Sequence, residues 1–290
     1  MRFLVMGSLN YDDSYSVDHI ARPGETIASA RLERACGGKG FNQAVALAKA
    51  GAQVCLAGLV GADGDELVRT AESFGVNCDF VGRAEERTGN AIIQVEESGQ
   101  NCIVLFGGAN RKWTNEYREG VLAHFGKGDV LILQNEVNDG AQIVRCAWER
   151  GMEIALNPSP FEPGILGWEL EKVSLFLLNE VEGEQMTGQS EPEKILDAIL
   201  ERFPSSAAVL TLGEKGAWYG DAGARCFCPA TRARAVDTTA AGDTFSGYFL
   251  AAKSRGTDPG RCLKAAADAA AIAVSRKGAA ASIPTWDEIW

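Results

Sequence analysis

The chain has 290 residues, enough for one large α/β domain or two small ones. Its hydrophobic content (46%) and charged content (23%) are those of an ordinary globular protein, and a net charge of −11 argues against nucleic acid or an anionic membrane as a partner. No run approaches the ~18 apolar residues of a membrane span, and the N-terminal apolar run is too short for a secretion signal, so a cytoplasmic location is expected.

Eight cysteines are scattered along the chain without a CxxC pair, and there are two histidines to assist them. A structural zinc site is therefore not expected, and free thiols suit a reducing compartment. Cys55 and Cys102 lie in apolar, strand-like runs, where we expect them to be small core residues.

Apolar, β-rich runs alternate with helical patterns along most of the chain. Strands are expected at residues 3–6, 54–60, 130–133, 153–156, 173–178 and 208–212. Helices are expected at residues 42–49, 66–74, 141–150 and 194–202, followed by two long ones at about 243–255 and 259–276. Strands that are apolar throughout and alternate with helices predict a parallel sheet covered on both faces.

Two segments break this alternation. Residues 11–36 contain no good helical pattern, and residues 26–34 alternate like a strand. Residues 90–96 and 101–106 form a hairpin-like pair with residues 97–100 as the turn. We therefore expect a small inserted sheet, from approximately 11–36 and 89–106, within a single α/β domain of residues 1–290. Such a layer can be a lid or a dimer surface, and an edge extension of the main sheet is the alternative.

Residues 237–247, DTTAAGDTFSG, are the most informative stretch. Ala240, Ala241 and Gly242 precede Asp243, and an apolar helix from about 243 to 254 follows. Small residues let backbone N–H groups gather around an anion at a helix N-terminus. A carboxylate beside them can accept a proton from a hydroxyl, which is what phosphoryl transfer to an alcohol requires. The alternative is that Asp243 only caps the helix.

A second motif is GGKGFNQA at residues 37–44. Its glycines permit a close backbone approach, and Lys39 and Asn42 supply hydrogen-bond donors at the start of a helix. A glycine-rich connection with Asn42 as N-cap is the alternative.

Polar residues also follow the predicted strands. Asn10 and Asp12 lie beyond the first strand, at the edge where open α/β sheets bind ligands, and they suit the hydroxyls of a polyol. An Asx-turn is the alternative reading of these two residues. Three further strand ends lead to segments with polar residues: one contains Glu136, one contains Asn179 and Glu182, and one begins at Gly213 and continues with Glu214 and Lys215. Polar groups from four strand ends at one edge point to a binding site rather than to stability alone.

Other nucleotide and hydrolase motifs are absent. The sequence has no GxxxxGK[ST], no GxGxxG after a strand and no GxSxG. These absences argue against a P-loop, a dinucleotide-dependent oxidoreductase and a nucleophile elbow.

With these blocks together, the chain resembles the PfkB carbohydrate-kinase family, and its ribokinases in particular, over essentially its whole length. The matching blocks, in the family's order, are GSLNYD, PGE (23–25), GGKGFNQA, NP (157–158), NEVEGEQMTG (179–188), TLGEKG (211–216), DTTAAGDTF and VSRKGAAASIP (274–284). The pattern DTxAAGDxF is the most specific of them. GGKGxNQA is more typical of ribokinases than of fructokinases, ketodeoxygluconate kinases or adenosine kinases.

The resemblance implies a three-layer α/β/α sandwich with a mostly parallel sheet and a β-sheet lid. It implies ATP-dependent phosphorylation of D-ribose at O5 to D-ribose 5-phosphate, with Asp243 as general base. The backbone N–H groups of Ala240, Ala241, Gly242 and Asp243 would form the anion hole. The residues implied to bind the sugar hydroxyls are Asn10, Asp12, Gly38, Lys39, Asn42 and Glu136, together with Asp243.

The resemblance also implies cofactors and a partner. Asn179 and Glu182 form the family's NxxE motif, which organises Mg²⁺ and phosphate through water. Thr211 and Gly213 would line the nucleotide site with Asn179 and Gly242. The positions implied for K⁺, mainly through carbonyl oxygens, are Asp237, Thr239, Ala273, Arg276, Gly278 and Ser282. The lid would cover the sugar and pair with its copy in a homodimer.

Two residues depart from the family's pattern. Ala266 stands where His or Asn is common near the adenine, which leaves the nucleotide preference open. Asn90 takes an apolar position in the lid, where it can alter contacts at the sugar's anomeric end. A kinase of another sugar or nucleoside (deoxyribose, ketodeoxygluconate, fructose or adenosine) is the first alternative, and a non-catalytic sugar-binding regulator is the remote one.

Overall fold

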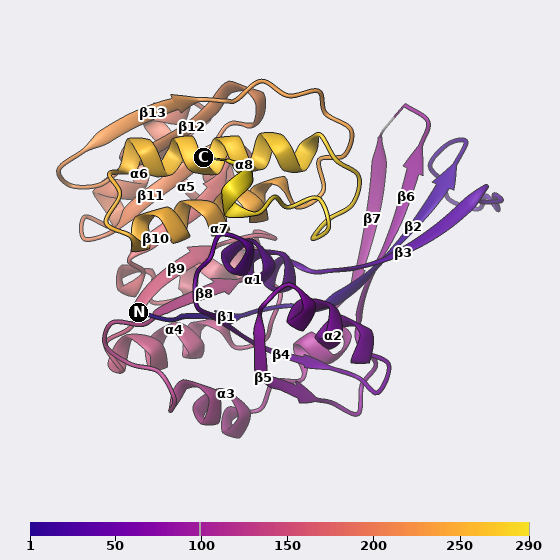
Figure 1. Cartoon of the computed structure of the whole chain (residues 1–290), viewed down its shortest axis with the longest axis horizontal. Helices are drawn as coiled ribbons and strands as arrows, with labels where there is room; N and C mark the ends of the chain where they lie inside the picture. The colour runs from indigo at the N-terminus through magenta and orange to yellow at the C-terminus, as the bar shows by residue number, and fades with distance from the viewer. Residues whose placement is uncertain (99, 290) are drawn as a thin grey trace.

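The computed structural model describes residues 1–98 and 100–289 and contains a nine-stranded sheet with helices on both faces (Figure 1). The strands, in spatial order, are β13 (Arg225–Pro229), β12 (Gly216–Gly220), β11 (Ala207–Thr211), β10 (Leu175–Asn179), β9 (Glu153–Asn157), β8 (Val130–Gln134), β1 (Phe3–Met6), β4 (Val54–Val60) and β5 (Asn77–Arg83). Within this sheet β12 is antiparallel to the other strands, which are all parallel to one another. The predicted, mostly parallel sheet is confirmed.

Strand β1 shows why the sheet is covered twice. Its side chains alternate, so that Phe3 and Val5 join one buried cluster while Leu4 and Met6 join the other. The helices that contribute to the first cluster are α1 (Lys39–Lys49), α2 (Asp65–Ser73), α7 (Ala241–Ser254) and α8 (Pro259–Val274). Those of the second are α3 (Asn115–Leu122), α4 (Gly140–Glu149), α5 (Glu180–Thr187) and α6 (Pro192–Arg202). The predicted three-layer sandwich is confirmed.

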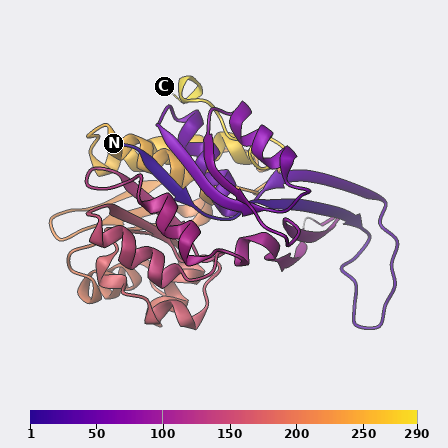
Figure 2. The same cartoon turned by 90° about the horizontal axis from the view of Figure 1, so that it is seen from below.

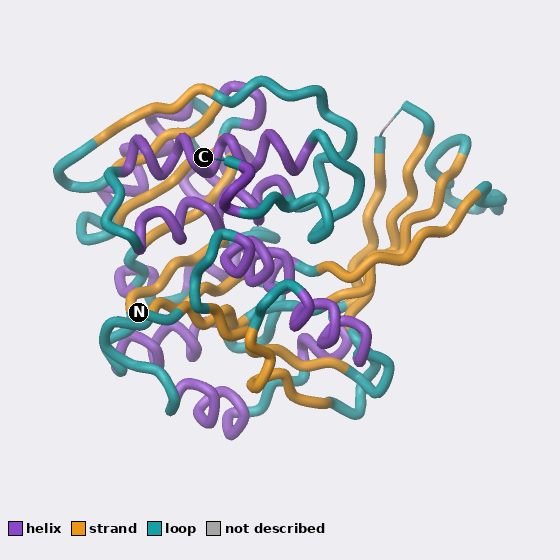
Figure 3. The backbone as a smooth tube through the Cα atoms, in the orientation of Figure 1, coloured by secondary structure: helices purple, strands orange, loops and turns teal. Residues whose placement is uncertain are grey.

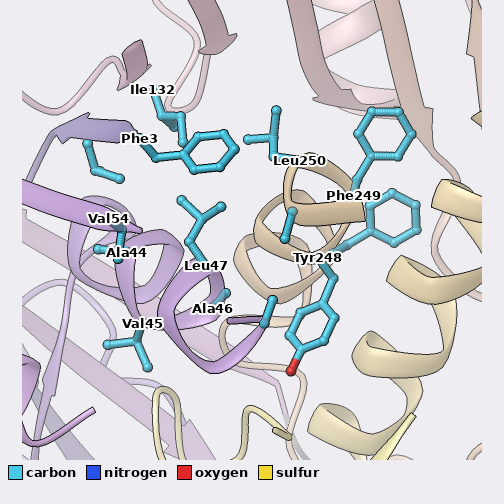
Figure 4. Packing of buried hydrophobic residues seen from close by; sticks show 14 of the residues in the cluster. Phe3, Ala44, Val45, Ala46, Leu47, Val54, Ile132, Tyr248, Phe249 and Leu250 are labelled. Atoms are coloured by element: carbon cyan, nitrogen blue, oxygen red, sulfur yellow. The ribbon is translucent and has the colours of Figure 1, made fainter. Parts of the chain in front are cut away.

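The packing of α1 against α7 positions the site. Figure 4 shows Leu47 of α1 and Leu250 of α7 in one core with Phe3 of β1. The two helices approach closely at Gly247, where an added Cβ would lie 2.5 Å from the Cβ of Ala46. This close contact helps to hold the first turns of both helices beside each other at the carboxyl edge of the sheet.

A separate four-stranded sheet projects from the body (Figure 3). Its strands, in spatial order, are β3 (Arg31–Gly37), β2 (Asn10–Val17), β6 (Gly89–Glu96) and β7 (Asn101–Phe106). Strands β6 and β7 pair antiparallel, as the hairpin-like pattern predicts, and the sheet is not an edge extension of the main one. The predicted turn at 97–100 includes residue 99, which lies outside the described residues.

Three details differ from expectation. The strand predicted at 26–34 begins at Arg31, because its register with β2 stops at the pair of Ser16 and Arg31. Beyond that pair the Ala30 N–H still donates to the Ser16 carbonyl, and residues 26–30 lie in the long connection seen in Figure 2. Cys102 is exposed on the edge strand β7 rather than buried in a core. Helix α7 begins at Ala241, two residues earlier than expected. Over the described chain, no helix is long and apolar enough to cross a membrane.

Candidate active site

The first turn of α7 forms one wall of a cleft. The residue before the helix, Ala240, has a left-handed backbone (φ 60°) and donates no side-chain cap. Such a backbone is uncommon for a residue with a Cβ and is typical of functional turns. Because Asp243 lies inside the first turn, the alternative that it only caps the helix is wrong. The turn thus directs N–H groups and one carboxylate to the same place.

Asp243 is 8% exposed, and each of its carboxylate oxygens accepts a hydrogen bond from an amide. Asn42 donates to Oδ2 at 3.1 Å, and Gln43 donates to Oδ1 at 2.9 Å. Both amides come from α1, which begins at Lys39, so Asn42 is not the N-cap of that helix. Our sequence reasoning missed Gln43, although it directly follows Asn42 in the GGKGFNQA motif.

A cluster of further acids surrounds this carboxylate. Burial, followed by the charges of Glu136 and Asp243, raises the pKa of Asp12 to about 7. Burial also raises the pKa of Glu136, although Lys39 acts in the opposite direction. The Ser8 hydroxyl donates to Oε2 of Glu136. These acids therefore form a buried, hydrogen-bonding pocket with an excess of negative charge.

Lys39 balances part of that charge. Burial lowers the pKa of its ammonium, but the neighbouring carboxylates of Asp243, Glu136 and Glu182 outweigh burial and leave the pKa above its usual value. Lys39 is therefore a permanent cation among the residues that line the cleft. A cation in this place suits a phosphoryl group that reaches the carboxylate.

The start of β2 lies against the start of α1. Gly38 has φ 98°, and an added Cβ would lie 2.9 Å from the Ser8 carbonyl oxygen and 3.0 Å from the Asn10 nitrogen, so only glycine fits there. Asn10 is 2% exposed, and its Oδ1 accepts a hydrogen bond from Asn110 at 2.7 Å. Because Asn10 lies within β2, the Asx-turn alternative is wrong. No sequence pattern indicates Asn110, which anchors Asn10 from a distant segment.

The cleft has a volume of about 260 Å³. It is lined by Lys39, Asn157, Leu177, Leu178, Asn179, Glu182, Val209, Thr211, Thr238, Ala240, Ala241, Gly242, Asp243, Phe245 and Ser246. It thus joins the ends of β10 and β11 to the first turns of α1 and α7. Gly213 belongs instead to the short helix Gly213–Lys215, beyond the lining residues.

Asn179 and Glu182 form a reciprocal cap on α5. Asn179 Oδ1 accepts from the Glu182 N–H at 2.9 Å, and Glu182 Oε2 accepts from the Asn179 N–H at 3.0 Å. Glu182 is 7% exposed and lines the cleft, so the cap holds a carboxylate at a fixed place there. An oxygen donor in this position suits a hydrated Mg²⁺.

The segment before α7 is tied to the end of α8. The Asp237 carboxylate accepts from the N–H groups of Thr239 and Gly278, each at 2.9 Å, and these hydrogen bonds keep its pKa low despite the opposing effect of burial. The Val274 carbonyl accepts from the Asp237 N–H at 3.2 Å. The structure therefore brings the segments 237–239 and 274–278 together. Ala273 is the penultimate residue of α8, Ser282 is buried, and the Arg276 side chain pairs with Glu288.

No cluster of three or more His, Cys, Asp or Glu residues suited to a metal occurs in the described ranges. A cation between the two tied segments would thus depend on carbonyl oxygens around a single carboxylate. Asp237, at the centre of these contacts, fits that chemistry.

The expectation for Asn90 is wrong. Its amide donates to the Tyr11 carbonyl and to Asp13 Oδ2, both at 2.9 Å. Asp12 faces Glu136 and Asp243, and successive side chains of a strand point to opposite faces, so Asp13 and its partner Asn90 lie on the other face of the lid. Ala91, which pairs in register with Asp12, shares the face of the site.

Comparison with known proteins identifies the family of this chain. Residues 2–286 match the pfkB family of carbohydrate kinases, and the chain belongs to that family. It is similar to the ribokinase of Haemophilus influenzae, with 34% identity over 98% of this chain and 95% of the relative. It is also similar to the deoxyribokinase of Salmonella typhi, with 31% identity over 99% of this chain and 97% of the relative.

Solved structures give the same result. The ribokinase of Cryptococcus neoformans var. grubii in complex with ADP is 34% identical, with a TM-score of 0.88 over 99% of this chain and 98% of that one. The ribokinase of Arabidopsis thaliana complexed with ribose and ATP is 29% identical, with the same TM-score of 0.88 over 99% and 97%. The chain is thus a ribokinase-type sugar kinase, as the sequence motifs predict. The roles of its individual residues stay predictions.

Proposed function

We propose that this kinase transfers the γ-phosphoryl group of ATP to O5 of D-ribose and forms D-ribose 5-phosphate. The observation that carries the proposal is the position of Asp243. Its buried carboxylate lies in the cleft, within the first turn of α7, and accepts hydrogen bonds from two amides. A carboxylate beside a set of helix N–H groups suits transfer to a hydroxyl. The Arabidopsis thaliana relative, complexed with ribose and ATP, supports this substrate pair.

In the proposed reaction Asp243 accepts the proton of the O5 hydroxyl. The oxygen then forms a bond to the γ-phosphorus while the bond between that phosphorus and the bridging oxygen breaks, and ADP leaves. The N–H groups of Ala240, Ala241, Gly242 and Asp243 stabilise the charge on the transferred group. Lys39 offsets the negative charges that meet there.

The sugar is proposed to lie between the lid and α1. The hydroxyl-binding set is Asn10, Asp12, Gly38, Lys39, Asn42 and Glu136. Asn42 supports this role because its Oδ1 is buried with no hydrogen-bond partner in the described protein, which suits a hydroxyl donor. Lid closure would exclude water, which otherwise competes as the phosphoryl acceptor.

We propose two cations beside the nucleotide. Glu182 and Asn179 would hold Mg²⁺ through water, and the ion would neutralise phosphate charge. Thr211 and Gly213 would contact the nucleotide with Asn179 and Gly242. The residues proposed around K⁺ are Asp237, Thr239, Ala273, Arg276, Gly278 and Ser282. K⁺ there would order the turn before α7.

The decisive test replaces the base. Asp243→Asn removes the proton acceptor with little change in volume, so we expect turnover to fall by at least about 10³-fold while ribose binding persists. Turnover is measured by ADP release with ribose, ATP, Mg²⁺ and K⁺, and ribose binding by calorimetry. Near-normal turnover of Asp243→Asn would remove this residue from the base role.

Deoxyribose is the second candidate substrate, because the Salmonella typhi relative is a deoxyribokinase. The same assay with ribose, deoxyribose, fructose, ketodeoxygluconate and adenosine separates the candidates by their kcat/KM values. A preference for ribose would support the proposed hydroxyl contacts. A preference for deoxyribose would leave the phosphoryl-transfer residues in place and change the role assigned to Asn10 and its neighbours.

We also propose that residues 1–290 form one domain whose lid pairs with a second copy. The lid strand β7 is exposed along its whole length and carries apolar side chains. Large exposed apolar patches are typical of interaction surfaces.

A further inference from the structure

A line of buried amides leads from the sheet to Asp243. Gln134 Nε2 donates to Gln43 Oε1 at 2.7 Å, and Gln43 Nε2 donates to Asp243 Oδ1 at 2.9 Å. Gln134 is 0% exposed and Gln43 is 1% exposed, so neither amide exchanges its partners for bulk water. Gln134 ends β8 and Gln43 lies in α1, so the line joins three elements that are distant in sequence.

Two glycines make space for this line. A Cβ on Gly7 would lie 2.2 Å from Gln134 Oε1, and a Cβ on Gly40 would lie 2.6 Å from the backbone of Gly7. Larger residues at either position would move β1, α1 or the Gln134 side chain. The end of β1 and the first turn of α1 can therefore lie close together, and Gln134 fits beside them, only because positions 7 and 40 carry no side chain.

The direction of the hydrogen bonds follows from the acceptor oxygens of Asp243. Its Oδ1 accepts from the N–H₂ group of Gln43, so the carbonyl of Gln43 faces Gln134, which donates in turn. The amide line therefore fixes the orientation of the Asp243 carboxylate from the side of the sheet.

One atom of the amide line, the side-chain oxygen of Gln134, opposes the stability of the fold. Gln134 Oε1 is buried and has no hydrogen-bond partner within the described part of the chain. Leaving such an atom unpaired is unfavourable, and an apolar side chain of the same length would avoid it. A residue that opposes stability beside a reacting group is expected where function requires it.

We propose that Gln43 and Gln134 are positioning residues that keep the Asp243 carboxylate aimed at the acceptor hydroxyl. This proposal rests on the base role of Asp243 proposed above. Gln43 acts directly on the carboxylate, and Gln134 acts through Gln43. The charged and titratable groups that also act on this pocket are Lys39 of α1, Asp12 of β2, Glu136 after β8 and Glu182 of α5.

The test uses Gln43→Met and Gln134→Met, which keep an unbranched side chain and remove the amide. For Gln43→Met we expect kcat to fall about 10-fold, with the KM for ribose nearly unchanged. Gln134→Met should lower kcat in the same way but less. The double variant should resemble Gln43→Met, because the second amide acts through the first. Gln134→Met alone suffices should Gln43→Met fail to fold.

Ser206→Ala is the matched control. Ser206 is 3% exposed and donates to the Val173 carbonyl at 2.7 Å, on the opposite edge of the sheet. We expect it to lower stability and to leave kcat and the KM for ribose unchanged. Glutamine variants that lose stability but keep the wild-type kcat would overturn the positioning role. If the glutamine variants keep the wild-type kcat while Asp243→Asn is inactive, only the amide line fails. If Asp243→Asn is active, the base role and the amide line fail together.

Discussion

Asp12 and Asp13 are neighbours in β2 with opposite environments. Asp12 lies among the acids of the site, where burial raises its pKa to about 7. Asp13 lies on the other face of the lid, where a bidentate hydrogen bond from Arg34 lowers its pKa. The strand therefore separates a carboxyl that destabilises the protein at neutral pH from one that stabilises it.

This contrast predicts a pH-dependent stability change. The raised pKa of Asp12 means that its favourable contribution to stability is fully present below its usual pKa of 3.8 and is lost as the pH rises through about 7. We expect Asp12→Asn to have little effect at pH 4 and to stabilise the sugar-free protein by roughly 2 kcal/mol at pH 8. Urea denaturation at the two pH values measures the difference.

Asp13→Asn is the control for that experiment, and its sign is opposite. The depressed pKa of Asp13 gives stability that is present above its usual pKa and lost as the pH falls, so the variant should be destabilised at pH 8. Equal stability of Asp12→Asn and the wild-type protein at pH 8 would contradict the assigned environment of Asp12.

Motif residues were easier to predict than the residues that support them. Asp243, Lys39 and Glu182 could be chosen because their segments carry glycines, helix starts and strand ends that the sequence displays. Gln43 and Gln134 could not be paired in advance, because their contact depends on how closely β1 and α1 approach. Asn90 was misplaced for a related reason: its face is set by the register between β6 and β2.

The contact between α1 and α7 joins the two motifs at the level of elements. α1 supplies Asn42 and Gln43, and α7 supplies the carboxylate that they bind. Gly247 permits this contact because it has no side chain facing Ala46. Figure 4 shows the apolar side chains that surround it.

We predict that Gly247→Ala separates the two helices. The added Cβ meets Ala46 at 2.5 Å, so the free energy of unfolding should fall by about 1–3 kcal/mol and activity should fall with it. Gly120→Ala in α3 has open space around its Cβ and should stabilise the protein by roughly 0.5–1 kcal/mol. Chemical denaturation compares the two variants. A stabilised Gly247→Ala variant would disprove the tight crossing.

Element boundaries were predicted best where the chain is buried on both faces. The strands 3–6 and 54–60 coincide with β1 and β4, since continuous apolar runs are typical of strands that are buried on both faces of a parallel sheet. The strand predicted at 26–34 was placed too close to the N-terminus, since β3 spans Arg31–Gly37. The sequence alternation there is weak, and the limits of the strand depend on its partner β2. Strands β12 and β13 were missed: they are short, and glycines and cysteines obscure their pattern.

On the scale of the whole molecule, the lid leaves a large apolar surface uncovered. Ile103, Val104, Leu105 and Phe106 of β7 are between 42% and 59% exposed. The strand is also at the edge of its sheet, where unpaired backbone groups invite another chain. A second copy of the lid would cover both features.

We therefore predict a homodimer that depends on β7. The double variant Ile103→Lys and Val104→Lys changes both faces of the strand and should yield a monomer, whereas the wild-type chain should be dimeric at micromolar concentration. Light scattering after size exclusion measures the mass. Phe227→Lys, an exposed position on the edge strand β13, is the control and should remain dimeric. A monomeric wild-type chain would count against the prediction.

The two sheets also divide the proposed tasks between them. The residues proposed for phosphoryl transfer lie on α1, α7 and the end of β10, whereas Asn10 and Asp12 lie on the lid strand β2. Substitutions in β2, β6 or β7 can thus alter which acceptor fits without moving the carboxylate or the N–H groups of α7. In evolutionary terms, the sugar specificity of such a molecule can change through substitutions in the lid while the residues proposed for phosphoryl transfer stay the same.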